Sequence, residues 1–324
     1  GDPGTIDITP KGEQRRLCFL FWNESSRHYE TTGLRPTMKT MLEVGHLPIA
    51  VDSFVAQSRQ QAPKSGGQPG HYGILRRAGF KSSEDRVETE ARIRPHADLA
   101  GRTVAGYDFI VNASTANDGD GRDNDPTDTG DWTADEDCEP GWRATPSSWH
   151  GTHVAGTIGA AGNNGVGVAG INWASKILPV RVLGKCGGYD SDIIDGARWA
   201  AGLSVSGVPA NANPAKVLNL SLGGPDPCPA AYQTAIDQIL AAGAVFVVAA
   251  GNNNYEASLD TPGNCTGVIT VAATNKTGAR ASYSNFGTII ELAAPGGDTG
   301  AGNGVYSTSD SGANNPAGDT YSYL

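Results

Sequence analysis

Residues 216–252, KVLNLSLGGPDPCPAAYQTAIDQILAAGAVFVVAAGN, carry the pattern that decides the fold. Two short runs rich in Val, Leu and Phe, residues 216–222 and 244–250, flank a stretch whose apolar residues recur at helical spacing. Similar runs at residues 176–183 and 267–274 also lack clean polar alternation. Such runs are typical of strands buried on both faces of a parallel sheet. Because strand–helix–strand alternation implies right-handed crossovers, we predict an α/β fold with a doubly wound, mostly parallel sheet.

Helices are expected between these strands. The apolar spacing predicts helices over residues 190–203 and 230–242, the first of them capped by Asp190 or Ser191. In doubly wound sheets the ligand site lies beyond the carboxyl ends of the strands. The polar residues that follow two of the strands, SLGG and AAGN, are therefore the places to look for a site.

Composition limits the classes of partner. The chain has 324 residues, 38% of them hydrophobic, which argues against a disordered chain. A net charge of −10 argues against a nucleic-acid partner. No apolar run reaches the roughly 18 residues of a membrane helix, and no signal-peptide pattern opens the chain.

The first 92 residues differ from the rest. They are almost neutral, contain both methionines, and include the linker-like QQAPKSGGQPG at residues 60–70. We therefore predict an anomalous segment over residues 1–92, either out-of-frame sequence or an accessory region, and a domain over residues 93–324.

A histidine pair stands out in SSWHGTHVAGTIGAAG, residues 147–162. His150 and His153 have the H-x-x-H spacing of a metal pair, but the glutamate of H-E-x-x-H is missing and no third His or Cys lies nearby. Two ordinary histidines at a helix start are a second interpretation. The third is that His150 is a general base at the rim of the sheet.

Four segments resemble the subtilisin-like serine proteases (subtilases). HGTHVAGT (150–157) is similar to their histidine motif and VLNLSLGG (217–224) to their substrate-binding strand. VVAAGN (247–252) is similar to their oxyanion segment, and YSNFG…LAAPGG (283–297) to their later core. The resemblance implies a subtilisin-like fold, a Ser-His-Asp triad, peptide-bond hydrolysis, protein or peptide substrates, a monomer, and a secreted bacterial origin.

The resemblance implies a role for each matching residue. His150 would accept the proton of a serine hydroxyl and pass it to the leaving amine. Asn252 would donate its side-chain amide to the developing oxyanion, although a turn asparagine after a buried strand is the structural alternative. A substrate-binding edge would be formed by Ser221, Leu222, Gly223, Gly224 and Gly251.

Two parts of the family pattern are missing. No G-T-S-x-A nucleophile segment occurs, and Ser307, Ser309, Ser311 and Ser322 lack its context, so none is nominated. Glu90 stands in the register of the orienting aspartate, but Ala91 and Arg92 replace its usual neighbours; Asp52 matches the motif only in part. We therefore expect a domain that is C-terminally incomplete and inactive as printed, with the endopeptidase function belonging to a parent protein. The alternative is a catalytically dead peptide-binding or calcium-binding protein.

An acidic loop, DGDGRDNDPTDTGD (118–131), precedes the histidine motif. Its carboxylates suit Ca²⁺, although a solvated acidic turn is an alternative and the loop is not an EF-hand. The predicted calcium ligands are Asp118, Asp120, Asp123, Asp125 and Asp128.

Four of the five cysteines lie after residue 92, and they allow three pairings. We favour Cys138–Cys186 and Cys228–Cys265, because each pair would join neighbouring loops at strand ends. Two disulfides indicate an oxidising, extracellular compartment. Cys18 is left over in the anomalous segment.

Overall fold

The computed structural model describes residues 20–23, 28–31, 86–89 and 93–324, the first three ranges as strand backbone only. The chain divides into two units, Gly1–Ser82 and Ser83–Leu324. In the first unit β1 (Leu20–Asn23) pairs with β2 (His28–Thr31) in an antiparallel hairpin. All other described elements belong to the second unit.

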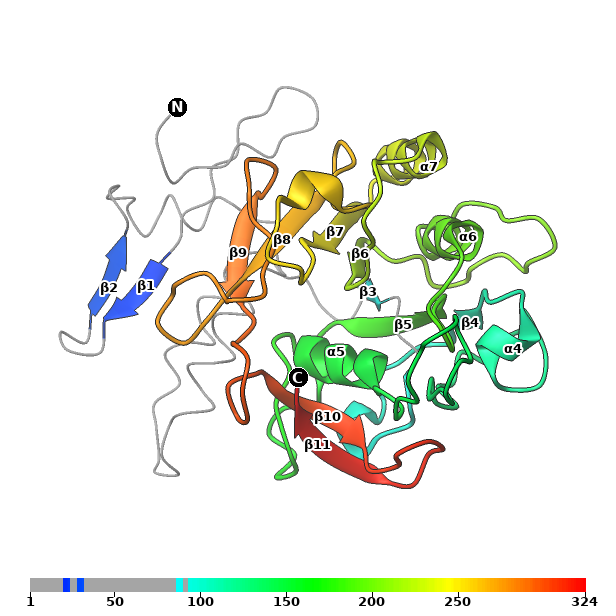
Figure 1. Cartoon of the computed structure of the whole chain (residues 1–324), viewed down its shortest axis with the longest axis horizontal. Helices are drawn as coiled ribbons and strands as arrows, with labels where there is room; N and C mark the ends of the chain where they lie inside the picture. The colour runs from blue at the N-terminus through cyan, green and yellow to red at the C-terminus, as the bar shows by residue number, and fades with distance from the viewer. Residues whose placement is uncertain (1–19, 24–27, 32–85, 90–92) are drawn as a thin grey trace. The chain divides into compact units, whose positions relative to one another are not determined.

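The second unit is built on a seven-stranded parallel sheet with the strand order β4-β5-β3-β6-β7-β8-β9 (Figure 1). Its strands are β3 (Arg86–Thr89), β4 (Tyr107–Asp108), β5 (Lys176–Arg181), β6 (Val217–Leu220), β7 (Val245–Ala249), β8 (Ile269–Thr274) and β9 (Leu292–Pro295). The four apolar runs of the sequence form β5 to β8, as predicted. The interior strand β3 comes from the stretch before Ile93 and pairs with both β5 and β6.

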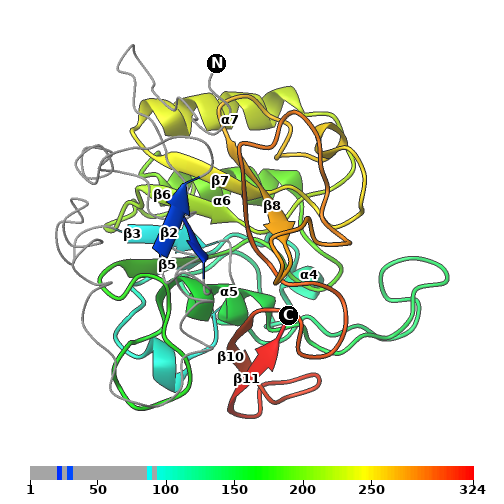
Figure 2. The ribbon, with the colours of Figure 1, turned by 90° about the vertical axis from the view of Figure 1, so that its left-hand side faces the viewer.

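Helices cover both faces of this sheet (Figure 2). Successive residues of a strand point to opposite faces. In β5, Leu178 and Val180 pack in the core that contains Trp199 and Ile236. Ile177, the residue before Leu178, packs instead with residues of the opposite face. The sheet is therefore doubly wound, as the sequence predicts.

Helices α6 (Asp190–Ala200) and α7 (Ala230–Ala241) supply that first core. The predicted cap of α6 is wrong. Tyr189 is the N-cap residue and makes no side-chain cap hydrogen bond, whereas Asp190 lies inside the first turn with Asp192. There the two carboxylates face the positive end of the helix dipole, which is a second way to stabilise a helix start.

The opposite face carries α5 (His150–Gly159) and the antiparallel hairpin of β10 (Tyr306–Asp310) and β11 (Asp319–Tyr323). Buried hydroxyls join them: Ser307 Oγ donates to the His153 carbonyl at 2.8 Å and Thr308 Oγ1 to the Thr152 carbonyl at 2.7 Å. Gly156 allows the close approach, since a Cβ there would lie 2.0 Å from Thr308 Oγ1. The hairpin is thus fastened to the helix that begins at His150.

Short elements complete the unit: η2 (Ala97–Leu99), α4 (Ala113–Ala116) and η3 (Ala257–Leu259). The favoured disulfides are confirmed, with Cys138–Cys186 at an S–S distance of 2.04 Å and Cys228–Cys265 at 1.99 Å. Among the described residues, no helix has the length and apolar character needed to span a bilayer.

Candidate active site

Two of the predicted site segments leave the sheet at the same edge. β6 and β7 are parallel neighbours, with Leu220 opposite Val248. The residues that follow them, 221–224 and 250–252, therefore both emerge at the carboxyl edge of the sheet. This is the edge at which the sequence predicts a ligand site.

His150 begins α5 and lies toward the same edge. The other end of α5 packs at the start of β5, where a Cβ on Gly159 would lie 3.0 Å from Ile177 Cδ1. Because a ten-residue helix extends for about 15 Å, the end of α5 that carries His150 lies toward the carboxyl ends of the strands. The imidazole is half-buried there.

Trp149 fixes the backbone just before His150. It has a φ of 50°, a left-handed conformation that bulky residues rarely adopt. Its indole is buried, and Nε1 donates to the Gly312 carbonyl in the β10–β11 loop at 2.7 Å. Burial and this bond hold the strained conformation in place. Motif reasoning passed over Trp149, because a backbone dihedral leaves no signal in residue type.

Asp131 is a second anchor of the same segment. It accepts hydrogen bonds from the Ser148 N–H and from Ser148 Oγ, both at 2.7 Å. Ser148 Oγ in turn accepts from the His150 N–H at 3.3 Å. Asp131 is the last aspartate of the acidic loop. The position of this loop shortly before the histidine motif was the one feature of the sequence that pointed to such a contact.

His153 has a structural place. Its Nε2 lies 3.0 Å from the Val305 carbonyl and 3.2 Å from the Ser322 carbonyl. Burial lowers the pKa of His153, and the charge of nearby His150 acts in the same direction, against the two carbonyl contacts. A neutral imidazole that binds hairpin carbonyls supports the structural interpretation of this histidine over the H-x-x-H metal pair.

The last residue of the predicted substrate edge, Gly224, is already paired through its backbone. Gly224 exchanges two backbone hydrogen bonds with Thr261, at 3.0 and 2.8 Å, so both its N–H and its carbonyl are already paired. Ser221, Leu222 and Gly223 precede this bridge, and Ser221 Oγ accepts from Asn219 Nδ2 at 3.1 Å. An extended peptide could therefore pair with residues 221–223 but not with Gly224.

Asn252 is exposed at the end of the β7 segment. Gly251 before it has a φ of 100°, which only glycine adopts without strain. The residues around Asn252 are bound by the buried side chain of Asn285, which sequence reasoning missed although it lies in the family-like YSNFG segment.

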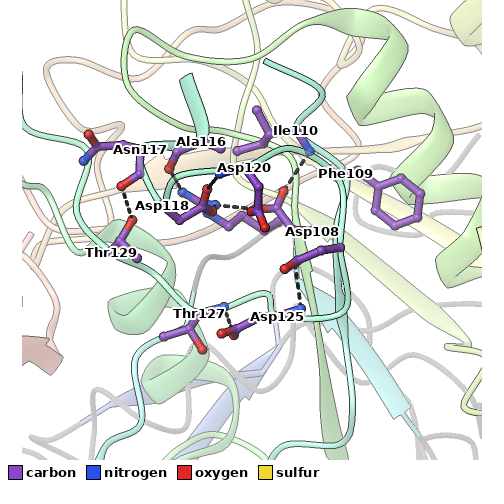
Figure 3. A network of polar contacts seen from close by, with 12 residues as sticks. Asp108, Phe109, Ile110, Ala116, Asn117, Asp118, Asp120, Asp125, Thr127 and Thr129 are labelled. Atoms are coloured by element: carbon purple, nitrogen blue, oxygen red, sulfur yellow. Dashed lines mark hydrogen bonds and ion pairs between the residues drawn. The ribbon is translucent and has the colours of Figure 1, made fainter. Parts of the chain in front are cut away.

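The acidic loop packs against a buried arginine. Figure 3 shows Asp108, Asp118 and the loop residues around them. Arg181, with no exposed side-chain surface, contacts the carboxylates of Asp108 and Asp118 and the carbonyl of Ala116. Burial raises the pKa of Asp108 to about 7, although the Arg181 guanidinium opposes this shift. A second arginine, Arg122, binds Asp192 and Asp195 of α6 at 2.8 and 2.7 Å.

The predicted calcium ligands do not converge. Asp123 Oδ1 accepts from the Asp125 N–H at 2.8 Å, and Asp125 Oδ1 from the Thr127 N–H at 3.0 Å. Asp128 Oδ1 accepts from the Gly130 N–H at 2.9 Å. Within the described part of the chain, no three acidic, His or Cys side chains are grouped to hold a metal ion. As arranged here, these carboxylates do not fit a calcium site.

The candidate carboxylates Glu90 and Asp52 lie outside the described residues. Glu90 follows directly in sequence on Thr89, the last residue of the interior strand β3. Thr89 pairs with Asn219, two residues before Ser221. The role of Glu90 stays a prediction.

The chain belongs to the subtilase family. The Subtilase family (Peptidase_S8) pattern matches residues 53–324, which is most of the chain. An extracellular protease of Xanthomonas campestris is 52% identical over 229 residues, and an extracellular basic protease of Dichelobacter nodosus is 50% identical over 233. Each alignment covers 71% of this chain but only 38% of the relative, so the chain spans well under half the length of these proteins.

A solved protease structure supports the fold. A protease of Pseudoalteromonas arctica is 51% identical and superposes with a TM-score of 0.73, over 75% of this chain and 72% of that one.

Subtilases commonly bind calcium.

Proposed function

We propose that the protein is a secreted serine endopeptidase of the subtilisin type, which hydrolyses peptide bonds in proteins or peptides. One observation supports this most strongly: His150, Asn252 and the 221–223 strand end all lie toward one edge of a subtilase sheet. Similarity to two proteases named extracellular, and two disulfides, favour secretion. A monomer with neither nucleic-acid nor membrane partners stays a prediction.

Each group has a definite part in this proposal. A substrate strand would pair with the backbone of residues 221–223 and present its carbonyl at the carboxyl edge. The neutral imidazole of His150 would take the proton of an attacking hydroxyl and deliver it to the leaving amine. Asn252 would donate its amide to the oxyanion, a contribution of about 10²–10³ in rate where it has been removed elsewhere. The serine nucleophile and the orienting carboxylate are not assigned.

A peptidyl chloromethyl ketone tests this arrangement without requiring a nucleophilic serine. If peptide binds along residues 221–223, its chloromethyl carbon reaches His150, the imidazole nitrogen displaces chloride, and a proton is released to solvent. Mass spectrometry should find one adduct, on His150. The controls are His96 and His153, both 5% exposed. Labelling elsewhere, or none, would count against the proposal.

A fluorophosphonate separates the enzyme from its alternative. Because no serine has the G-T-S-x-A context, we expect no adduct with the chain as printed. A serine adduct lost in His150→Ala would reveal a working nucleophile. Peptide protection of residues 217–222 in hydrogen exchange, without any serine adduct, would favour the peptide-binding alternative.

Calcium binding by Asp118, Asp120, Asp123, Asp125 and Asp128 stays a prediction from composition and from the frequency of calcium binding in the family. Because the carboxylates do not converge, binding would require the loop to rearrange. Calorimetric titration with CaCl₂ tests it. A saturable heat that Asp120→Asn removes would support the site, and its absence would leave Arg181 as the cation of this loop.

A further inference from the structure

The side chain of Asn285 is completely buried beside the turn that carries Asn252. Its Oδ1 accepts hydrogen bonds from the Asn253 N–H at 2.9 Å and from the Tyr255 N–H at 3.2 Å. Its Nδ2 donates to the Ala250 carbonyl at 2.9 Å. The amide therefore binds the chain on both sides of Asn252, whose own side chain is exposed.

The main chain of Asn285 adds to this. Its N–H donates to the Gly251 carbonyl at 2.9 Å, so the residue directly before Asn252 is also held. Gly251 lies against the amide: a Cβ there would be 2.3 Å from Asn285 Nδ2 and 2.1 Å from Asp260 Oδ2. The turn therefore packs directly on the side chains of Asn285 and Asp260, and no side chain fits at position 251.

Asp260 fixes which way the Asn285 amide points. This carboxylate is 4% exposed and accepts the remaining hydrogen of Asn285 Nδ2. If the amide were flipped, its oxygen would face a carboxylate and a carbonyl, and its NH₂ would face two N–H groups. Only one orientation satisfies every group, so this amide cannot be replaced by an apolar or an acidic side chain of similar shape.

We propose that Asn285, oriented by Asp260, is a positioning residue that fixes the side-chain amide of Asn252 at the carboxyl edge of the sheet. It acts through the turn 250–255 and does not touch substrate. The proposal rests on the proposed function for what Asn252 does, but not for how Asn252 is held.

The test uses Asn285→Asp, which keeps the shape, removes both donors and sets a second carboxylate against Asp260. Hydrogen exchange at the Asn253 and Tyr255 amides should accelerate by about 100-fold, as expected when a buried network loses its donors. The side-chain NH₂ signal of Asn252 in ¹⁵N NMR should move and show a lower order parameter. The milder variant Asp260→Asn, which removes only the orienting charge, should show the same changes with smaller amplitude.

Two comparisons separate positioning from general stability. Asn211 also donates to two carbonyls and accepts one N–H, but in the loop after α6, so Asn211→Asp is the matched control. It should leave the Asn252 signal unchanged even where it lowers stability. Asp260→Asn combined with Asn285→Asp restores a donor between the two positions and should recover at least part of the exchange protection.

An unchanged Asn252 signal in Asn285→Asp would overturn the proposal, as would an equal change in Asn211→Asp. A failure of the proposed function would show in different experiments from a failure of this proposal. A wild-type chain that neither binds peptide nor reacts with the chloromethyl ketone would remove the protease assignment, while the NMR result on Asn252 would stand.

Discussion

At the scale of single residues, the start of α5 is shaped by neighbours that no motif names. Trp149 carries a left-handed backbone and a buried indole, and Asp131 binds Ser148. These two contacts fix the backbone from which the imidazole of His150 extends. Preorganisation of this kind is what a general base requires, because a small misplacement costs much of the rate.

We expect Trp149→Phe to change the environment of the His150 imidazole although it lowers the stability of the protein only modestly. The variant keeps an aromatic ring but loses the 2.7 Å bond to the Gly312 carbonyl, which should lower the free energy of unfolding by about 1 kcal/mol. The imidazole resonances of His150 should shift. Trp199→Phe is the control, because it loses the comparable bond to the Pro209 carbonyl far from α5. An unmoved His150 signal in Trp149→Phe would contradict this account.

The lowered pKa of His153 predicts that the free energy of unfolding depends on pH. Because burial lowers its pKa below the ordinary 6.5, the unfolded chain binds a proton at a pH where the folded protein does not. Its contribution to stability is therefore complete above about pH 6.5 and is lost as the pH falls from there toward the folded-state pKa. Urea unfolding between pH 5 and pH 8 should show a shallower fall for His153→Gln than for the wild type. Parallel curves would show that the imidazole is not held neutral.

At the scale of elements, the β10–β11 hairpin and α5 form one joint in which glycine matters. Gly156→Ala would set a methyl group 2.0 Å from Thr308 Oγ1 and 2.6 Å from Ser307 Oγ. We expect the hairpin to be displaced, with a cost of about 1–3 kcal/mol in unfolding free energy. Gly159→Ala on the same helix meets only the flexible end of Ile177, at 3.0 Å, and should cost less. Equal losses in urea titrations would argue against this packing.

The contribution of the buried Arg181–Asp108 pair to the stability of the acidic loop can also be measured. Arg181→Met would leave Asp108 fully buried without a counter-charge. Breaking a buried pair costs up to about 3–5 kcal/mol if the carboxylate stays ionised, and less where it takes up a proton, which its raised pKa favours. The loss should therefore grow as the pH rises above 7, and adding Asp108→Asn, which removes the ionisable group, should recover much of it there. No recovery in the double variant would mean that packing of the arginine stem, rather than its charge, holds the loop.

At the scale of the whole molecule, sequence reasoning succeeded where burial is apolar. β5 to β8 are buried by Val, Ile, Leu, Phe and Ala, so their runs predicted both strand and parallel sheet. It failed where burial is polar. Four residues of β10, STSD, are buried through hydroxyl and carboxylate bonds, and β3, RVET, has one apolar residue.

Prediction of the site residues also succeeded for one kind of residue and failed for another. Sequence motifs named His150 and Asn252, because their chemistry is carried by residue type. They missed Trp149, Asp131 and Asn285, whose effect depends on a dihedral angle or on contacts between distant segments. Gly224 was assigned to the substrate edge by resemblance. Its pairing with Thr261 could not be predicted, because it depends on a segment 37 residues away whose path the local pattern does not contain.

The strand β3 decides how the chain can be divided, and two truncations test it. The composition change suggests a boundary at residue 92, whereas β3 precedes that residue and lies inside the sheet, between β5 and β6. Residues 83–324 keep all seven strands, so they should unfold cooperatively in urea. Residues 93–324 would leave the facing edges of β5 and β6 without their partner, and each unpaired backbone group buried there costs free energy. We expect this shorter chain to aggregate or to lose the cooperative transition. If both truncations unfolded with the same midpoint and slope, β3 would not be an integral part of the sheet, and the domain would begin at Ile93.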